Sequence, residues 1–288
     1  VALVAEAASA PWRHPASAVT AFAADPGLIL KGLGMIRDIR RIGIDMRYGT
    51  VLQSIEQDGD RLRATFAGPL GETITETVDV LCMNDGFEPQ NEILRLLGAA
   101  MTYDTHAGHL RCNRDARMET SVPDIFAVGD CAGLGGAPAA RVEGTIAGRA
   151  AAARVGYGDA HDLFAEERRL RRYRRFQRSL WKMHAIGPKT PDPKYRETIV
   201  CRCEEITLGE VLDGLEATPG HVGTLKRATR VGMGRCQGRY CGPVAMRLVA
   251  EATGKPIEDL STFAPRVPIK PVAIASILAA QEALDAPD

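Results

Sequence analysis

The sequence predicts an α/β protein that ends in a small, mostly helical domain with clustered cysteines. Strand-like apolar runs alternate with helix-like runs over roughly the first 150 residues, which is typical of α/β folds. Four of the seven cysteines then fall between residues 201 and 241, in two close pairs. Close pairs separated by a longer gap are typical of a metal site, because each pair approaches the metal from one turn.

The N-terminal run is the first candidate strand. Residues 1–7 read VALVAEA and predict a buried strand, with Glu6 as the polar residue near its end. In dinucleotide-binding folds an acid at the end of the second strand holds the adenosine ribose hydroxyls, and a glycine-rich loop precedes it by about twenty residues. We therefore expect the chain to begin inside a domain. Glu6 is a candidate nucleotide-binding residue, with an ordinary strand-end acid as an equally weighted alternative.

A helix and several strands follow. Residues 25–43 predict a helix with Asp25 as its N-cap. Residues 44–68 alternate as an antiparallel meander, and residues 73–87 predict a returning strand with Cys82 in the core. This order is typical of the second half of a nucleotide-binding domain in flavoprotein reductases.

A glycine-rich turn lies within residues 120–150. The short apolar run Ile125–Val128 predicts a strand that ends in Gly129 and Asp130, and a helix of small residues begins near Pro138. A carboxylate at the carboxyl end of a strand accepts hydrogen bonds from ligand hydroxyls, and glycines let the backbone approach closely. The alternative is a glycine–aspartate turn of the kind found in any α/β domain.

This string resembles the second FAD fingerprint of the two-dinucleotide-binding-domain flavoproteins, which are glutathione-reductase-like. The resemblance implies that Asp130 holds the ribityl chain of FAD and that the following helix N-terminus stabilises negative charge on the flavin. Cys131 has no partner cysteine nearby in the sequence, so we expect a structural rather than a redox role for it. The cofactor-binding residues predicted here are Gly129, Asp130, Gly136, Ala137 and Pro138.

The cysteine pairs each precede a predicted helix. Thr207 and Glu210 form a capping box after the first pair, and Pro243 suits the first turn of a helix after the second. Helix N-termini stabilise anions such as thiolates. The predicted metal ligands are Cys201, Cys203, Cys236 and Cys241. The basic residues around them in sequence are Arg202, Lys226, Arg227, Arg230, Arg235 and Arg239.

Four thiolates bind either structural zinc or an iron–sulfur cluster. Zinc sites usually separate the cysteines of a pair by about two to four residues, whereas one and four residues separate them here. The spacing therefore favours a [2Fe-2S] cluster over zinc. The strings CRCEEIT and LKRATRVGMGRCQGRYC also resemble the bacterioferritin-associated ferredoxin-like domain, which implies a helical [2Fe-2S] domain over residues 198–252.

The segments flanking the cysteine domain are less distinctive. Residues 155–197 predict a basic helical connector and linker, with a solvated arginine face or, alternatively, a docking surface for a partner subunit. Residues 253–288 predict an extended segment and a short helix that pack back on the flavin domain. The apolar residues of the connector near helical spacing are Leu163, Phe164, Leu170, Tyr173, Leu180 and Trp181.

Composition limits the classes of partner. Lysine plus arginine equals aspartate plus glutamate at 36 each, so the net charge of zero does not favour binding to nucleic acid or a membrane surface. No apolar run reaches the roughly eighteen residues of a membrane span, and residues 1–10 lack the basic start of a signal peptide. We expect a cytoplasmic protein, with association at the inner face of the membrane left open.

In this order the segments resemble the alpha (A) subunit of the opine dehydrogenase, hydrogen cyanide synthase and hydroxyproline or proline dehydrogenase group. The resemblance implies an oxidoreductase subunit that carries FAD and a [2Fe-2S] cluster. It would relay electrons within a hetero-oligomer from a partner flavoprotein (beta or B) subunit. It allows a further partner, a small ferredoxin-like subunit, and NAD or another adenine nucleotide at the second domain.

The resemblance also implies a division of the chain. Residues 1–85 correspond to the second half of an NAD-like domain, and residues 86–154 to the C-terminal part of the FAD domain. The connector spans residues 155–197, the [2Fe-2S] domain residues 198–252 and the tail residues 253–288. No acid–base pair is assignable to substrate chemistry, so no catalytic residue is predicted. The alternatives are a self-contained NAD(P)H-dependent FAD/iron–sulfur reductase and a non-catalytic iron–sulfur or zinc scaffold.

Overall fold

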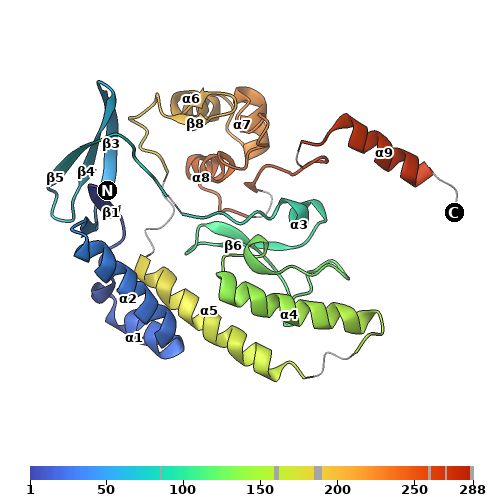
Figure 1. Cartoon of the computed structure of the whole chain (residues 1–288). Coiled ribbons are helices and arrows are strands. Elements are labelled where there is room, and N and C mark those ends of the chain that lie inside the picture. The colour runs from blue at the N-terminus through green and yellow to red at the C-terminus, as the bar shows by residue number, and fades with distance from the viewer. Residues whose placement is uncertain (85, 159–161, 185–189, 259–260, 270, 286–288) are drawn as a thin grey trace. The chain divides into compact units, whose positions relative to one another are not determined.

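The computed structural model describes residues 1–84, 86–158, 162–184, 190–258, 261–269 and 271–285. The chain divides into two compact units that exchange short segments around residue 130. Unit 1 consists of residues 1–88, 128–130 and 134–188, and unit 2 of residues 89–127, 131–133 and 189–288. The strands β1–β5 and the helices α1, α2, α4 and α5 belong to unit 1 (Figure 1).

Two small sheets build the strand part of unit 1. β1 (Leu3–Glu6) pairs in parallel with β2 (Asp45–Tyr48), so Glu6 lies opposite Tyr48. β3 (Val51–Asp58) and β4 (Arg61–Ala67) pair antiparallel, as predicted within residues 44–68, and β5 (Thr73–Val78), from the predicted returning strand, pairs antiparallel with β4. β2 also lies within residues 44–68 but pairs in parallel with β1, so that part of the predicted meander is wrong. The prediction of a strand at residues 1–7 is confirmed, but it is not buried, since its residues are half-buried or exposed.

The returning strand predicted for residues 73–87 is only partly present. β5 ends at Val78, and no strand follows in residues 79–84. Cys82 is exposed, so its prediction as a core residue is wrong. The apolar sequence around it satisfied the strand pattern, but no described strand pairs with it to cover either face.

Four long helices complete unit 1. They are α1 (Pro15–Ala24), α2 (Pro26–Arg41), α4 (Ala137–Arg154) and α5 (Phe164–His184), with a short 3₁₀ turn at Pro11–Arg13 before α1. The predicted cap of α2 is confirmed, because the Asp25 carboxylate accepts from Leu28 N at 3.1 Å. α1 packs on α5 through a core of Ala21, Ala24, Phe176 and Met183.

The basic segment forms a helix that is central to unit 1. Leu170 is buried on α5, as its helical spacing predicts, and Leu163 just before α5 is buried too, whereas Phe164 is exposed. Arg172 and Arg174 of α5 form ion pairs with other segments, although the Arg172 side chain remains 53% exposed. Arg172 pairs with Asp25 at 2.7 Å, and Arg174 pairs with the buried Glu143 of α4 at 2.9 Å. These pairs tie α5 to segments far away in the sequence.

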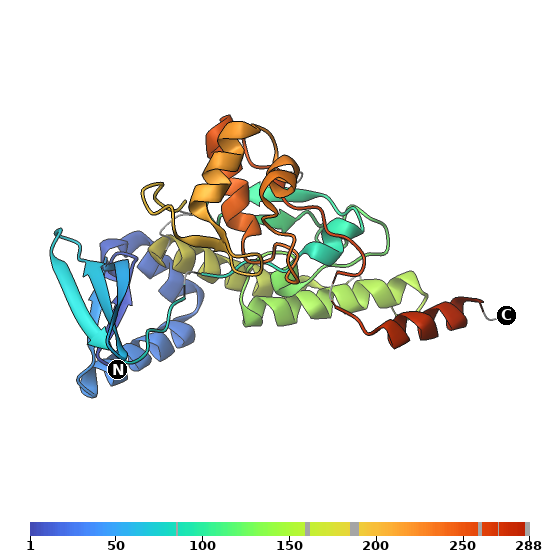
Figure 2. The ribbon, with the colours of Figure 1, turned by 90° about the horizontal axis from the view of Figure 1, so that it is seen from above.

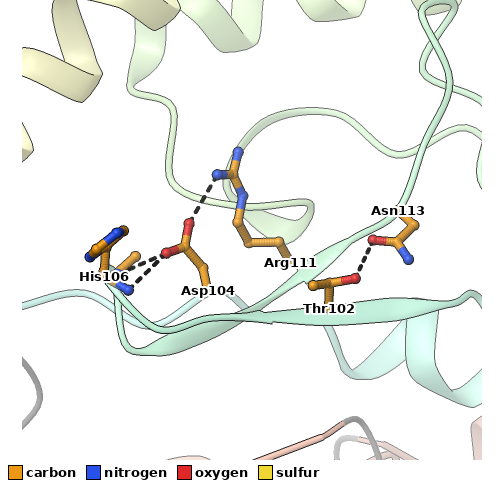
Figure 3. Close-up of polar contacts among 6 residues, drawn as sticks. Thr102, Asp104, His106, Arg111 and Asn113 are labelled. Atoms are coloured by element: carbon orange, nitrogen blue, oxygen red, sulfur yellow. Dashed lines mark hydrogen bonds and ion pairs between the residues drawn. The ribbon is translucent and has the colours of Figure 1, made fainter.

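Unit 2 begins with a short helix and a hairpin. α3 (Glu92–Leu96) precedes β6 (Met101–Asp104) and β7 (His109–Cys112), which pair antiparallel. Asp104 closes the hairpin turn by accepting from the backbone N–H groups of His106 and Ala107, both at 3.0 Å (Figure 3). Ile125–Val128, predicted as a strand, makes only an isolated bridge between Phe126 and Glu119. The segment is too short to form a ladder.

The cysteine domain of unit 2 is mostly helical, as predicted. β8 (Ile199–Cys201) pairs with β9 (Ile206–Thr207), and α6 (Leu208–Ala217), α7 (Val222–Thr229) and α8 (Gly242–Thr253) follow. The three helices lie together (Figure 1). The capping box is confirmed, because Glu210 N donates to Thr207 Oγ1 at 3.2 Å and Thr207 N donates to Glu210 Oε2 at 2.8 Å.

Burial changes along the C-terminal segment. Phe263 is buried in the core of the cysteine domain. α9 (Ile274–Asp285) stands away from α6–α8 in both ribbon views (Figures 1 and 2), and its side chains at residues 274–281 are exposed. Within unit 2, Arg95 of α3 donates to the Phe263 carbonyl at 2.6 Å.

Among the residues the structure describes, no single helix combines the length and apolarity of a membrane span. The helices Pro15–Ala24 and Pro26–Arg41 reach that length and apolarity only when they are taken together, and a bend of 119° separates them.

Candidate functional site

The predicted flavin loop is fixed to α4 by a buried carboxylate. Gly129 opens the 3₁₀ turn Gly129–Cys131, with a φ of 69° that favours glycine. Its N–H donates at 3.0 Å to Oε2 of Glu143, which is only 3% exposed and also accepts from Arg174. Space is also tight, since a Cβ on Gly129 would lie 3.3 Å from that of Ala140.

The N-terminus of α4 follows this turn within unit 1. Gly136 is the N-cap with a φ of 78°, no side chain caps the helix, and Pro138 lies in its first turn. The first N–H groups of such a helix are left to a ligand or to water, and its dipole favours negative charge there. Gly136, Ala137 and Pro138 therefore lie where the sequence placed a cofactor-binding helix start.

Asp130 projects from this turn without a protein partner. It is exposed, and within the described residues its carboxylate makes no hydrogen bond or ion pair. A free carboxylate beside close-packed glycines can accept hydrogen bonds from ligand hydroxyls. The turn therefore offers an exposed carboxylate at the position where the resemblance places the ribityl chain of FAD.

Unit 2 contributes an arginine that the sequence did not single out. Arg111 of β7 pairs with Asp104 at 3.1 Å (Figure 3) and lies against Gly133, where a Cβ would meet its Nε at 2.9 Å. Burial acts first on Asp104 and opposes ionisation, but the Ala107 N–H and Arg111 outweigh it and lower its pKa. Nothing in the local sequence pattern around Arg111 indicated this contact.

Glu6 uses its carboxylate locally. Its Oε1 accepts from Ala8 N at 3.1 Å, and its Oε2 lies 4.0 Å from Nδ1 of His184 on α5. Because β1 and β2 are parallel, their carboxyl ends meet at one edge of the sheet, which is where nucleotides bind in such folds. Glu6 is therefore at the predicted edge, but its carboxylate is engaged with its own turn and with α5.

A cavity of about 370 Å³ opens at this same edge of unit 1. Trp12 and Tyr48 meet there edge to face with ring centroids 5.3 Å apart, and Arg13 and Arg40 supply positive charge. Burial raises the pKa of Tyr48. Sequence reasoning missed these four residues, which come from the turn after β1, from α2 and from the end of β2. No single local pattern links them.

The cysteine domain brings the four predicted ligands into two pairs. The Cys203 thiol donates to Cys236, and the Cys241 thiol donates to Cys201. Cys201 and Cys241 are buried, Cys236 is half-buried and Cys203 is exposed. Each contact thus joins one cysteine of the first sequence pair to one cysteine of the second, more than thirty positions away.

The loop backbone is arranged to hold a thiolate at Cys236. Burial opposes ionisation there, but hydrogen bonds from the Cys203 thiol and from the backbone N–H groups of Tyr240, Gly238 and Arg239 lower its pKa. Burial, followed by the neighbouring Cys201, raises the pKa of Cys241 to about 12. A thiolate at Cys241 therefore needs a positive partner such as a metal.

Close packing fixes the two cysteine turns together. A Cβ on Gly234 would overlap that of Cys203, so only glycine allows this approach. Cys241 is the N-cap residue of α8, with Pro243 in the first turn, as the sequence predicted. The surrounding charge is lower than predicted, because Arg230 pairs with Glu204 at 3.0 Å and Arg239 pairs with Glu92 at 2.8 Å.

Within the described residues, no three or more histidine, cysteine, aspartate or glutamate side chains converge on one point as ligands of a single metal ion. The thiols influence one another beyond these two pairs, since Cys236 as well as Cys201 raises the pKa of Cys241. Four thiolates are the donor set that a cluster of two irons requires, since each iron takes two of them. In number and residue type the four cysteines match that donor set.

Two protein families match separate parts of the chain. Residues 18–153 match the family described as pyridine nucleotide-disulphide oxidoreductase. Residues 197–282 match the family described as the sarcosine oxidase A3 domain. The boundary between the two matches lies in the segment that contains α5 and the following linker.

Curated relatives resemble the chain across both parts. It is 29% identical to hydrogen cyanide synthase subunit HcnB of Pseudomonas aeruginosa, over 86% of this chain and 55% of the relative. It is 29% identical to the opine oxidase A subunit of Rhizobium meliloti, over 92% of this chain and 57% of the relative. It is 30% identical to the opine oxidase A subunit of Agrobacterium tumefaciens, over 86% of this chain and 50% of the relative. The chain thus spans about half the length of the relatives it matches. It is related to subunits of oxidoreductases.

A solved structure shares the fold. The L-proline dehydrogenase from P. horikoshii superposes with a TM-score of 0.61 over 84% of this chain and 47% of that one, at 22% sequence identity. This likeness establishes an α/β dehydrogenase-type fold for the chain.

Proposed function

We propose that this chain is the FAD- and [2Fe-2S]-carrying part of a heteromeric dehydrogenase that oxidises an amine, an amino acid or an opine. Its role is to relay electrons from a partner flavoprotein subunit to an acceptor. The observation that carries the proposal is the meeting of Cys201 with Cys241 and of Cys203 with Cys236 in a chain that also contains the exposed Asp130 loop.

The protein residues have distinct parts in this relay. Asp130 would accept hydrogen bonds from the ribityl hydroxyls, and the uncapped start of α4 would stabilise negative charge beside the flavin. The four cysteines would bind the cluster, and the N–H groups directed at Cys236 would stabilise its thiolate. FAD exchanges two electrons and a [2Fe-2S] cluster one, so the pair converts two-electron chemistry into single-electron transfer.

The names of the relatives support the class of reaction. The opine oxidase and hydrogen cyanide synthase relatives are each named as subunits, which favours a hetero-oligomer here as well. We place the oxidation of substrate in the partner subunit, because the described residues show no acid–base pair beside an arginine positioned to fix a substrate carboxylate. A further partner would be a small ferredoxin-like subunit, and the compartment would be the cytoplasm.

The cavity beside Trp12 favours a second function. An aromatic pair with Arg13 and Arg40 at the carboxyl ends of two parallel strands suits an adenine nucleotide, whose base can stack and whose phosphates need cations. If NAD(P)H bound there and reduced the flavin, the protein would be a self-contained reductase. Glu6 would then act from the rim of the site.

The proposal is tested by purifying the protein anaerobically together with its co-expressed partner. Absorption spectra, flavin extraction, and iron, zinc and acid-labile sulfide analysis should show FAD with about two iron and two sulfide per chain. Dye reduction by opines, D- and L-amino acids should require both chains. Stoichiometric zinc without sulfide would contradict the cluster, and rapid bleaching of the flavin by NAD(P)H without a partner would favour the self-contained reductase.

A further inference from the structure

A second basic cavity lies in the cysteine domain, beside α7. It encloses about 430 Å³ and is lined by Lys226 and Arg227 of α7, by Phe263 and Arg266 of the following segment, and by His221 at the start of α7. This volume is within the range of roughly 300–1,000 Å³ that small-molecule sites occupy. None of these residues takes part in the proposed electron relay.

The wall formed by the segment around Phe263 is held firmly. The Phe263 ring lies on glycines of the cysteine loop, since a Cβ on Gly232 would come within 2.6 Å of it and one on Gly238 would overlap it. The Phe263 carbonyl accepts from Arg95 at 2.6 Å. Arg266, three residues later, is thereby brought beside α7, although about forty residues separate it from Lys226 in the sequence.

The described residues do not neutralise the cations of the cavity. Across the part of the chain that the structure describes, Lys226, Arg227 and Arg266 form no ion pair with a carboxylate. Like charges brought together from two segments repel each other, and a bound anion would relieve that repulsion. Arg230 and Arg239 in the same domain do have carboxylate partners.

The remaining groups add direction and an apolar surface. Nδ1 of His221 accepts from Gly223 N at 3.1 Å, which leaves Nε2 as the N–H donor of the neutral ring. Lys226 Nζ lies 5.3 Å from the centroid of the Phe263 ring, a cation–π contact that restrains the ammonium at the wall. Phe263 and Met233 give the cavity an apolar side.

From this arrangement we infer that the cavity is a binding site for a small phosphate monoester with an apolar or aromatic body. Lys226, Arg227 and Arg266 neutralise the dianionic phosphate, and His221 donates a further hydrogen bond. The apolar wall accepts the body of the ligand. The site is separate from the flavin loop and from the nucleotide cavity of unit 1, and the inference does not rest on the proposed function.

The test is calorimetric titration of the purified full chain with phenyl phosphate, and with benzyl alcohol as the neutral probe. Phenyl phosphate should bind saturably and more weakly as salt is added, because screening reduces attraction between charges. Arg266→Gln and Lys226→Gln should each weaken binding about tenfold, the typical effect of losing a hydrogen bond to a charged group. Lys255→Gln, which removes an exposed cation of unit 2 that does not line the cavity, is the matched control and should bind like the wild type.

A further variant tests the site without touching its cations. Ala264→Glu places a carboxylate at an exposed position on the rim and should abolish binding while thermal unfolding is unchanged. Equal affinity of Arg266→Gln and Lys255→Gln, no saturable binding, or equally tight binding of benzyl alcohol would each overturn the inference. None of these measurements depends on iron or flavin content, so failure of the proposed function would leave the result interpretable.

Discussion

The cysteine domain and the β1–β2 region with α2 bury their apolar residues to very different extents. Thirteen buried residues form the core of the cysteine domain. β1, β2 and α2 contain no fully buried residue, and Leu30, Leu33 and Met35 of α2 are between 55% and 62% exposed. The helices α6–α8 bury one another over a short stretch of sequence, whereas β1 and β2 pair across about forty residues. A two-stranded sheet is marginally stable on its own.

This difference shows that the cysteine domain and the β1–β2 region are held in different ways. The cysteine turns are fixed by short-range capping, glycine contacts and a local core. The flavin loop is joined to α4 and α5 by the polar contacts of Glu143 with Gly129 and Arg174, beside buried apolar residues of α4 such as Ile146. Substitutions in the two parts should therefore differ in what they disturb.

The largest effect is expected from the cysteines themselves. Cys203→Ser should lose most of the iron, because the exposed ligand would be replaced by one that binds iron weakly. Cys131→Ser, outside the cysteine domain, should retain the iron and serves as the control. Iron and sulfide analysis of anaerobic preparations gives the answer, and equal iron in the two variants would remove the case for a cluster at these cysteines.

Gly234→Ala should disturb the packing of the two cysteine turns while leaving all four cysteines in place. The added Cβ would overlap that of Cys203, so the turns must move apart, with an expected cost on the order of 1–3 kcal/mol. We expect reduced iron content and a lower urea midpoint. Gly254→Ala, which meets no neighbouring atom but has a φ of 65°, measures backbone strain alone. Iron loss as large in Gly254→Ala would argue against the contact with Cys203.

On the flavin side, Asp130→Ala should weaken FAD binding by about 10- to 100-fold through loss of a hydrogen-bond acceptor. Because Asp130 is exposed and makes no protein contact among the described residues, unfolding in the absence of flavin should change little. Fluorescence titration with FAD and a thermal melt separate the two effects. Unchanged flavin affinity would exclude Asp130 from the site.

Thr207→Ala should destabilise the cysteine domain by about 1 kcal/mol, because it removes the N-cap of α6 and half of the capping box. Thr145→Ala on the exposed face of α4 is the control, since its hydroxyl bonds only to the Arg141 carbonyl of its own helix. Urea unfolding monitored by circular dichroism measures both. An equal loss in the two variants would mean that the cap does not stabilise α6.

The smallest effect concerns the pH dependence of unit 1. The hydrogen bond from Arg172, opposed by burial and aided by Leu28 N, lowers the pKa of Asp25. A lowered carboxyl pKa stabilises the fold above the ordinary value of about 3.9 and loses that contribution as the pH falls through the folded value. Asp25→Asn should therefore be less stable than the wild type at pH 7, with the difference vanishing in acid. A difference independent of pH would assign the effect to the cap rather than to the charge.

Whether a structural feature could be predicted from the sequence depends on the sequence separation of the residues that form it. The capping box at Thr207, the cap at Asp25, the antiparallel pairing within residues 51–67 and the helix after Gly136 all follow from residues close to each other in the sequence. The same local patterns failed at Cys82 and at residues 125–128. A strand exists only if another segment pairs with it, and the local sequence does not specify that partner.

The sequence by itself determined the residue types and spacings: two cysteine pairs before helices, a glycine–aspartate turn before α4 and an acid at the end of β1. Only the tertiary structure decided which groups meet. It joined Cys201 to Cys241 and Cys203 to Cys236, engaged Glu6 with its own turn, and brought Arg266 beside Lys226. The physical reason is that propensities and caps act over a few residues, whereas packing and ion pairing select among all segments that the folded chain brings within reach.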